Sequence, residues 1–200
     1  CDFHEQDPGN PYYFAPAAEP FHEVITAWQR SFQATMGKNH AKYFDAKGWL
    51  YFTKEYFDLF YPAYGDTYPI YNGSIGMTYE QAGHSRGGLA IEVNNDTLTL
   101  RDRIEHHFTT SMSTIEVASL HASKINAEFK KFFDDGLING NAVYKTYVIN
   151  GTNLNKVAAL KDLFSRNNIS FNYAKNGTVV KGYNYFTGKE ENYTTNQNDL

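Results

Sequence analysis

The sequence has 200 residues, of which 42% are hydrophobic and 20% are charged, a balance typical of a folded globular protein. The formal net charge is −4 and no basic run occurs, which argues against a nucleic-acid-binding surface. No apolar stretch approaches the roughly 20 residues that span a bilayer, and the single cysteine, Cys1, excludes an intrachain disulfide. We therefore expect a globular chain with no nucleic acid and no membrane span among its interactions.

The first elements in chain order are a strand and a helix joined by a long loop. Asp2–Glu5 reads as the end of a buried strand without its beginning, so we expect the sequence to start within a domain. A polar, proline-rich loop follows to residue 20. From Phe21 to about Lys38, apolar residues recur at helical spacing and predict a helix that stops at Gly37. Residues 49–53 predict a short strand.

The middle of the chain combines a loop, a strand and a long helix. Residues 61–73 are dense in Gly, Pro and Tyr and predict a loop, and residues 75–80 predict a buried strand that ends in an acid. A long helix is then expected, capped by Thr97 or Thr99 and ending near Gly136. Its apolar side chains step by three or four residues: Leu100, Ile104, Phe108, Met112 and Ile115.

The end of the chain predicts a second, separate module. Residues 136–141 resemble a linker, and residues 144–149, 154–164 and 169–173 predict a strand, a helix and a strand. Asn153 is the candidate cap of the helix. We therefore divide the chain into a first domain at 1–137 and the start of a small α/β accessory module at 142–200.

Two residues have side chains suited to chemistry at the predicted strand ends. His4 is flanked by acids and could bind a metal through neutral imidazole, or it could be a partly buried structural histidine. Glu80 ends an otherwise apolar strand, where burial would raise its pKa and suit it to general-base catalysis. The alternative for Glu80 is a salt bridge, with Arg86 as the obvious partner.

A histidine pair in the predicted long helix is the other group that could hold a metal. His106 lies four residues after Asp102, a spacing that can share a metal on one helix face. No second ligand pair has matching spacing, so we interpret His106 and His107 as structural or solvent-facing.

Two stretches together resemble bacterial zinc carboxypeptidases of the carboxypeptidase A superfamily. Asp2–Glu5 with the following Pro11–Pro16 resembles the strand that carries the third zinc ligand of that family. Tyr61–Asp66, followed by Gly73–Glu80, is similar to its substrate loop and catalytic strand. The resemblance covers roughly residues 1–135, and its most specific part is Gly-Ser-Ile-Gly-Met-Thr-Tyr-Glu.

This resemblance implies a fold, a cofactor and a set of roles. The fold is an α/β domain with a mixed, mostly parallel sheet flanked by helices. The cofactor is zinc, with His4 as one ligand, and Glu80 is the general base that activates the metal-bound water. The substrate is a peptide with a free C-terminus, contacted by Tyr64 in the loop, by Asp66 in the specificity pocket and by Arg86. The implied location is extracellular or periplasmic.

The sequence also departs from the family pattern. The first two zinc ligands of the family form a His-x-x-Glu motif, which occurs nowhere in these 200 residues, and the Asn-Arg pair that binds the substrate carboxylate has no match either. We therefore expect the chain to be a fragment that binds zinc weakly and is inactive alone. Two alternatives are a non-catalytic module that binds peptide or glycan through the tyrosine-rich loop, and a piece whose long helix mediates association. The sequence leaves the oligomeric state open.

Overall fold

The computed structural model describes residues 1–83, 90–93, 96–138 and 145–200, and side chains are described outside 84–96 and 138–144. The chain forms two compact units, Cys1–Asn139 and Gly140–Leu200. Each unit is described by itself below.

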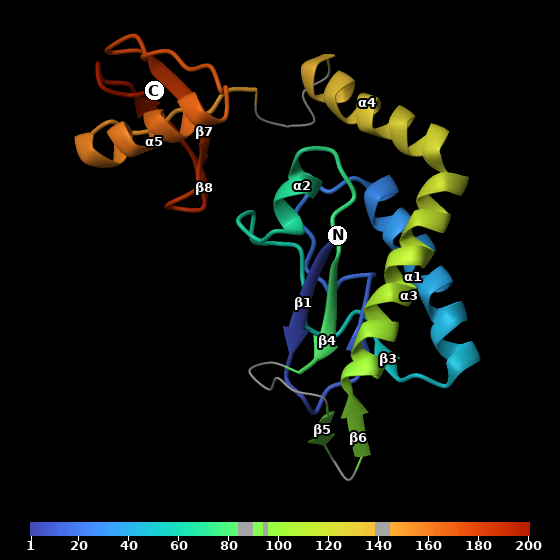
Figure 1. Ribbon diagram of the computed structural model, residues 1–200. Coiled ribbons are helices and arrows are strands. Elements are labelled where there is room, and N and C mark those ends of the chain that lie inside the picture. Colours follow the sequence, from blue (N-terminus) through green and yellow to red (C-terminus); the bar gives the residue numbers. More distant parts are fainter. Residues whose placement is uncertain (84–89, 94–95, 139–144) are drawn as a thin grey trace. The chain divides into compact units, whose positions relative to one another are not determined.

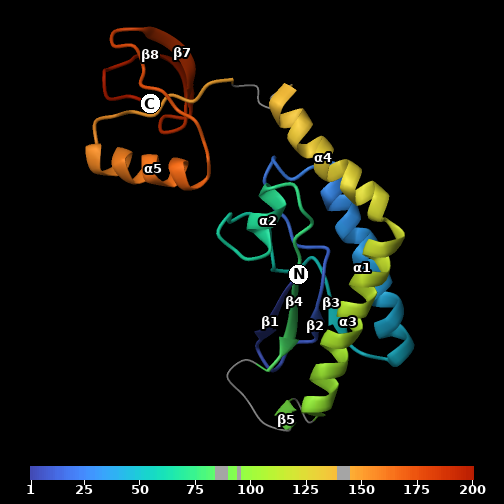
Figure 2. The same cartoon turned by 45° about the horizontal axis from the view of Figure 1, so that its top comes forward.

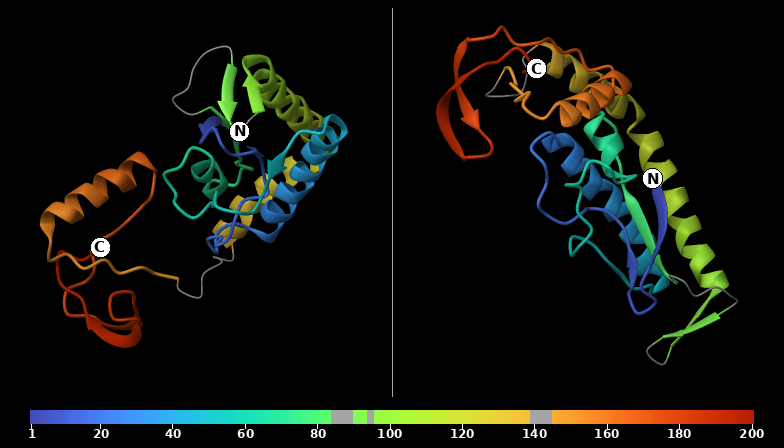
Figure 3. Two further views of the ribbon diagram at one scale, coloured as in Figure 1. Left: turned by 90° about the horizontal axis from the view of Figure 1, so that it is seen from below. Right: turned by 90° about the vertical axis from the view of Figure 1, so that its left-hand side faces the viewer.

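The first unit contains a four-stranded sheet with the strand order β1-β4-β2-β3 (Figure 1). The strands are short: β1 is Asp2–Gln6, β2 is Tyr12–Tyr13, β3 is Tyr51–Phe52 and β4 is Thr78–Ala82. β1 runs parallel to β4, as Figure 3 shows, and β2 runs parallel to β3 but antiparallel to β4. The expected mixed, mostly parallel sheet with helices is therefore confirmed at the level of an α/β fold.

The first long helix, α1 (Ala27–Lys47), runs about ten residues beyond its predicted end. Thr26 begins it with a capping box to Gln29, and Gly48 ends it in the left-handed conformation at φ 68°. The prediction that Gly37 stops the helix is wrong. Gly37 lies inside α1 because the chain passes close by: a Cβ there would be 2.1 Å from the carbonyl oxygen of Ala15.

The predicted single helix after Thr99 is two helices. After the short helix α2 (Thr67–Tyr71) and the hairpin strands β5 (Ala90–Val93) and β6 (Asp96–Thr99), α3 spans Leu100–Leu120 and α4 spans Ala122–Ile138. Thr99 caps α3 with Asp102, as predicted, and His121 is the C-cap between α3 and α4. The helix was predicted to end near Gly136. α4 instead ends at Ile138, so Gly136 lies inside the helix and does not cap it.

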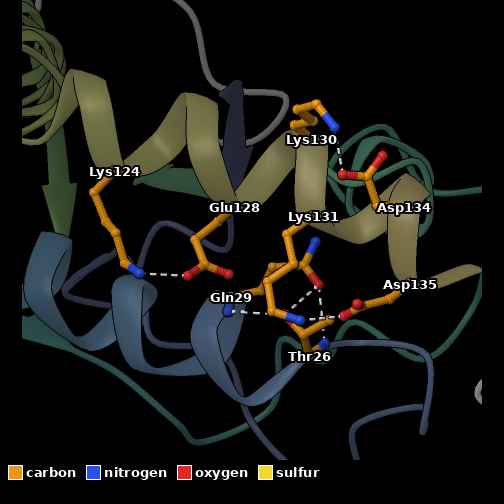
Figure 4. A network of polar contacts seen from close by, with 8 residues as sticks. All are labelled: Thr26, Gln29, Lys124, Glu128, Lys130, Lys131, Asp134 and Asp135. Carbon is orange, nitrogen blue, oxygen red and sulfur yellow. Dashed lines mark hydrogen bonds and ion pairs between the residues drawn. The ribbon is translucent and has the colours of Figure 1, made fainter.

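The exposed side of α4 carries charged pairs at helical spacing. Lys124 bonds Glu128, Lys130 bonds Asp134 and Lys131 bonds Asp135, and Figure 4 shows these pairs near the Thr26–Gln29 cap of α1. Each such pair contributes a few tenths of a kcal/mol to an exposed helix.

The main core lies on one face of the sheet, against α1 and α3, which run side by side (Figure 2). Its largest fully buried side chains are aromatic: Tyr12, Phe14, Phe44 and Tyr79. A polar layer crosses this core, because the buried His40 ring lies 2.7 Å from the Ser113 hydroxyl and 3.0 Å from the Tyr79 hydroxyl. Both ring nitrogens of His40 therefore keep a partner, as burial of polar atoms requires.

Over residues 145–200, the second unit contains one helix, α5 (Leu154–Arg166), and one hairpin, β7 (Val179–Asn184) with β8 (Lys189–Thr194). Asn153 caps α5 as predicted. The strands predicted at 144–149 and 169–173 are absent from the described residues of those ranges. Ile149 and Leu200 exchange two backbone hydrogen bonds there, but among the described residues these bonds do not extend into a strand ladder.

Candidate functional site

His4 and Glu80 lie directly beside each other on neighbouring strands. They are register partners in the parallel β1–β4 pair. Because parallel strands pleat in phase about 4.8 Å apart, the two side chains point to the same face of the sheet. The preceding pair, Phe3 and Tyr79, points to the opposite face and brings its rings within 5.2 Å on the side of α3. His4 and Glu80 thus share the face that α1 and α3 do not cover.

The positions of both residues within their strands differ from the prediction. Each is the third of five residues, because β1 continues to Gln6 and β4 to Ala82. The prediction that they end their strands is therefore wrong. Gln6 holds this continuation together, since its side-chain amide donates to the Glu80 carbonyl at 3.1 Å and to the Pro11 carbonyl at 2.6 Å.

The loop that precedes β4 is brought back to the same region by two glycines. A Cβ at Gly65 would lie 2.3 Å from a carboxylate oxygen of Asp2, so the loop packs directly on the start of β1. A Cβ at Gly76 would lie 1.7 Å from the carbonyl oxygen of Asp66. Close packing of the loop therefore requires glycine at positions 65 and 76, independently of any catalytic role.

The electrostatics of the site centre on Glu80, which is 7% exposed. Burial raises the pKa of its carboxyl from 4.5 to about 7; His4 opposes this shift, and the carboxylates of Glu5, Asp2 and Asp66 add to it. No hydrogen bond or ion pair to the Glu80 side chain occurs among the described residues. A carboxyl with a pKa near neutrality can both accept and release a proton at physiological pH.

Tyr13 belongs to this face and was missed by the sequence analysis. It is the antiparallel register partner of Glu80 on β2. Burial raises its pKa, and the negative charges of Asp66, Glu80 and Asp58 raise it further, so the phenol stays protonated. The alternation of Tyr12 and Tyr13 along β2 was the only signal for it, because one of two adjacent strand residues must face away from the core.

The site provides only part of a donor set for zinc. The His4 imidazole is largely exposed and lies 3.4 Å from the Asp2 carboxylate. Within residues 1–83 and the other described ranges, however, no three His, Cys, Asp or Glu side chains are arranged to hold a metal ion. A catalytic zinc needs three protein ligands. The described residues therefore do not form a complete zinc site.

The predicted substrate-contacting residues have different positions. Asp66 is buried and accepts a hydrogen bond from the Thr67 hydroxyl at 3.1 Å. Tyr64 is more than half exposed, and its ring packs edge-on against Tyr61 at 5.2 Å. Arg86 lies outside the described residues. Of the predicted residues, the structure thus brings His4, Glu80 and Asp66 into one electrostatic neighbourhood.

The three buried or half-buried histidines of the helical side have structural partners. His106 Nδ1 lies 2.7 Å from the Gln81 side-chain oxygen, and His107 Nδ1 lies 2.8 Å from the Tyr12 hydroxyl. Burial lowers the pKa of His40 and of His106 to about 4. His40 and His106 are buried packing groups, which agrees with the structural role expected for His106, and His107 is half-buried.

Comparison with known proteins adds no identification. No family model, curated protein or solved structure matches the chain. The resemblance to zinc carboxypeptidases stays a hypothesis that rests on the residues quoted above. Among the described helices, none combines the length and the hydropathy needed to cross a bilayer.

Proposed function

We propose that this chain is the C-terminal part of a zinc metallocarboxypeptidase domain, with Glu80 as general base and His4 as one metal ligand. The observation that carries the proposal is the register pairing of His4 with Glu80 on the face of the sheet that α1 and α3 do not cover. The raised pKa of Glu80, about 7, supports it, because a general base works best when its pKa is close to the working pH.

The chain's own contribution to the reaction is proton transfer. A water molecule beside the Glu80 carboxylate would lose a proton to it as the oxygen attacks the peptide carbonyl. The same carboxyl would then donate that proton to the departing amine. Asp66 keeps the affinity of Glu80 for the proton high through its negative charge. One imidazole is not a zinc site, so no step is assigned to the metal here.

The proposed substrate is a peptide with a free C-terminus, and the proposed location is extracellular or periplasmic. Tyr64 and Arg86 are proposed substrate contacts on the strength of the resemblance. Asp66, which lies near Glu80, is proposed to line the specificity pocket. The chain alone is proposed to bind zinc weakly and to lack activity.

The test is a carboxypeptidase assay on the natural protein that contains this chain, with Glu80→Gln as the variant. We expect the variant to lose about 10²- to 10⁴-fold in kcat, the range for removal of a general base. Glu23→Gln, which changes an exposed carboxylate elsewhere in the unit, is the matched control and should keep full activity. Wild-type activity in Glu80→Gln would refute the assigned role.

A second candidate function has one supporting observation. Tyr61 and Tyr64 in the loop and Tyr68 in the adjoining helix α2 are each more than half exposed, and such rings suit contact with a peptide or glycan. A non-catalytic binding module would use this loop. Binding that is lost in Tyr61→Ala and retained in Glu80→Gln, without hydrolysis by the natural protein, would favour this candidate.

A further inference from the structure

Gln6, the last residue of β1, is a buried side chain whose amide is fully engaged. Its nitrogen donates to the Pro11 carbonyl at 2.6 Å and to the Glu80 carbonyl at 3.1 Å. Its oxygen accepts from the Asn10 side-chain amide and from the Tyr56 hydroxyl, each at 3.3 Å. A glutamine amide has two hydrogens to donate and two lone pairs on its oxygen, so Gln6 uses all four.

The chemistry of these partners fixes the direction of the amide. Backbone carbonyls only accept hydrogen bonds, so the nitrogen of Gln6 must face Pro11 and Glu80. A flipped amide would place its oxygen against these two carbonyls and its hydrogens against the Asn10 amide hydrogens. Gln6 is therefore held in one orientation, with both donors on the backbone of neighbouring segments.

The Gln6 side chain ties three strands together. In the parallel pair Gln6 is opposite Ala82, whereas the carbonyl that it bonds belongs to Glu80, two residues earlier on β4. Glu80 pairs in turn with Tyr13 of β2, and Pro11 directly precedes that strand. In the described part of the chain, β2 and β4 share this one register pair, so the Gln6 amide reinforces a short ladder.

The hydrogen bond to the Glu80 carbonyl is compatible with only one register of β1 on β4. A slip by one residue would turn the Glu80 side chain to the opposite face of the sheet, away from His4. The same slip would move the Glu80 carbonyl about 3.3 Å along the strand, beyond reach of the Gln6 amide. The interaction therefore favours the register in which His4 and Glu80 share a face.

We propose that Gln6 is a positioning residue for Glu80: its amide holds the Glu80 peptide unit so that the carboxyl keeps its place beside His4. This inference rests on the proposed function, in which a general base must stay within hydrogen-bond reach of the proton that it takes. A misplacement of about 1 Å can cost about 10²-fold in rate. The contacts that support the inference all lie within the first unit.

The first measurement uses this chain alone and needs no substrate. NMR follows the exchange of glutamine side-chain amide hydrogens with water, and Gln197, at an exposed position, is the reference. We expect the Gln6 amide to exchange at least about tenfold more slowly than that of Gln197, because hydrogen bonding and burial protect it. Equal exchange rates would overturn the proposal.

The second measurement uses the natural protein that contains this chain and the variant Gln6→Met, which keeps the length of the side chain and removes both donors. We expect kcat to fall about 10- to 10²-fold, with KM changed by less than about threefold. Gln81→Met is the matched control. Gln81 is a buried glutamine next to Glu80 on β4, but it contacts His106 of α3 on the opposite face. This variant should keep kcat, and circular dichroism checks that each variant is folded.

A double-mutant cycle separates positioning of Glu80 from a general loss of structure. In the Glu80→Gln background, Gln6→Met should lower kcat by no more than about twofold, because the group that Gln6 positions is already gone. A fall as large as that in the wild-type background would overturn the proposal.

The same data distinguish this inference from the proposed function. Loss of activity in Glu80→Gln together with full kcat in folded Gln6→Met would refute the inference alone. Full activity of Glu80→Gln, or a natural protein without carboxypeptidase activity, would refute the proposed function and this inference with it.

Discussion

Replacement of Glu80 by glutamine should stabilise the protein, and the gain should grow with pH. The folded pKa of this carboxyl, about 7, lies above its ordinary value of 4.5. Between these values the folded state holds a proton that the unfolded chain has already released. Stability is therefore fully present below about pH 4.5 and is lost as the pH rises through 7. Glutamine cannot ionise and avoids this loss.

The magnitude follows from the same two values. Ionising a buried carboxyl with this difference in pKa costs about 3 kcal/mol at pH 8 or above, as an upper limit. The advantage of Glu80→Gln should fall to near zero at pH 4. For a chain of this size, 3 kcal/mol corresponds to roughly 10 °C in Tm.

Urea unfolding followed by tryptophan fluorescence provides the assay. Both tryptophans, Trp28 and Trp49, pack against the core of the first unit, so the signal reports that unit alone. Glu23→Gln, at an exposed position, is the control and should show a flat difference from wild type across pH. A stability difference for Glu80→Gln that does not change between pH 4 and 8 would refute the reasoning.

Three further predictions concern the parts that hold the site in place. Gly76→Ala should cost about 3 kcal/mol or more, measured by urea unfolding, because its Cβ would collide with the Asp66 carbonyl. Thr99→Ala should cost about 1 kcal/mol in the same assay, because it removes the capping box of α3. Acid should destabilise the fold as the pH falls from 6.5 towards 4, because the unfolded chain takes up protons on His40 and His106 at a higher pH than the folded chain does. Urea unfolding of Glu80→Gln at several pH values measures this change in stability without the contribution of Glu80.

Matched changes elsewhere control for these effects. Gly136→Ala, in α4 of the same unit, places its Cβ in open space and should be close to neutral, unlike Gly76→Ala. Ser119→Ala, at an exposed position of that unit, should leave stability unchanged. A flat stability profile for Glu80→Gln between pH 4 and 6.5 would contradict the neutral, buried state of the two histidines.

Local signals identified the elements of this fold better than they identified its faces. The capping residues Thr99 and Asn153 were predicted correctly, because a cap is a contact between near neighbours in sequence. The helical spacing of the apolar residues in α3 was identified correctly, but the first five of them, Leu100 to Ile115, face outwards. Periodicity locates a stripe on a helix but does not say which partner covers it. The polar residues on the other side are buried because Tyr79 and Gln81 supply hydrogen bonds from a distant strand.

The candidate site was predictable only in part for the same reason. The resemblance singled out His4 and Glu80, but their register depends on pairing between two strands that are far apart in the chain. Tyr13 lies beside Glu80 because β2 pairs antiparallel with β4, and no local sequence pattern predicts that pairing. Gly37 was interpreted as the end of a helix and Gly76 as part of a strand, yet each is required by the close approach of a remote carbonyl.

The pairing of β1 with β4 also constrains the order of folding. Gln6 and Glu80, which hydrogen-bond across this pair, are 74 positions apart in the chain. Contacts of such long range form slowly, because the intervening loop must close before any pairing energy is gained. During synthesis the first strand must wait until β4 has left the ribosome. Until then the unpaired backbone groups and the side chains of β1 are exposed together. During this period β1 is accessible to a chaperone.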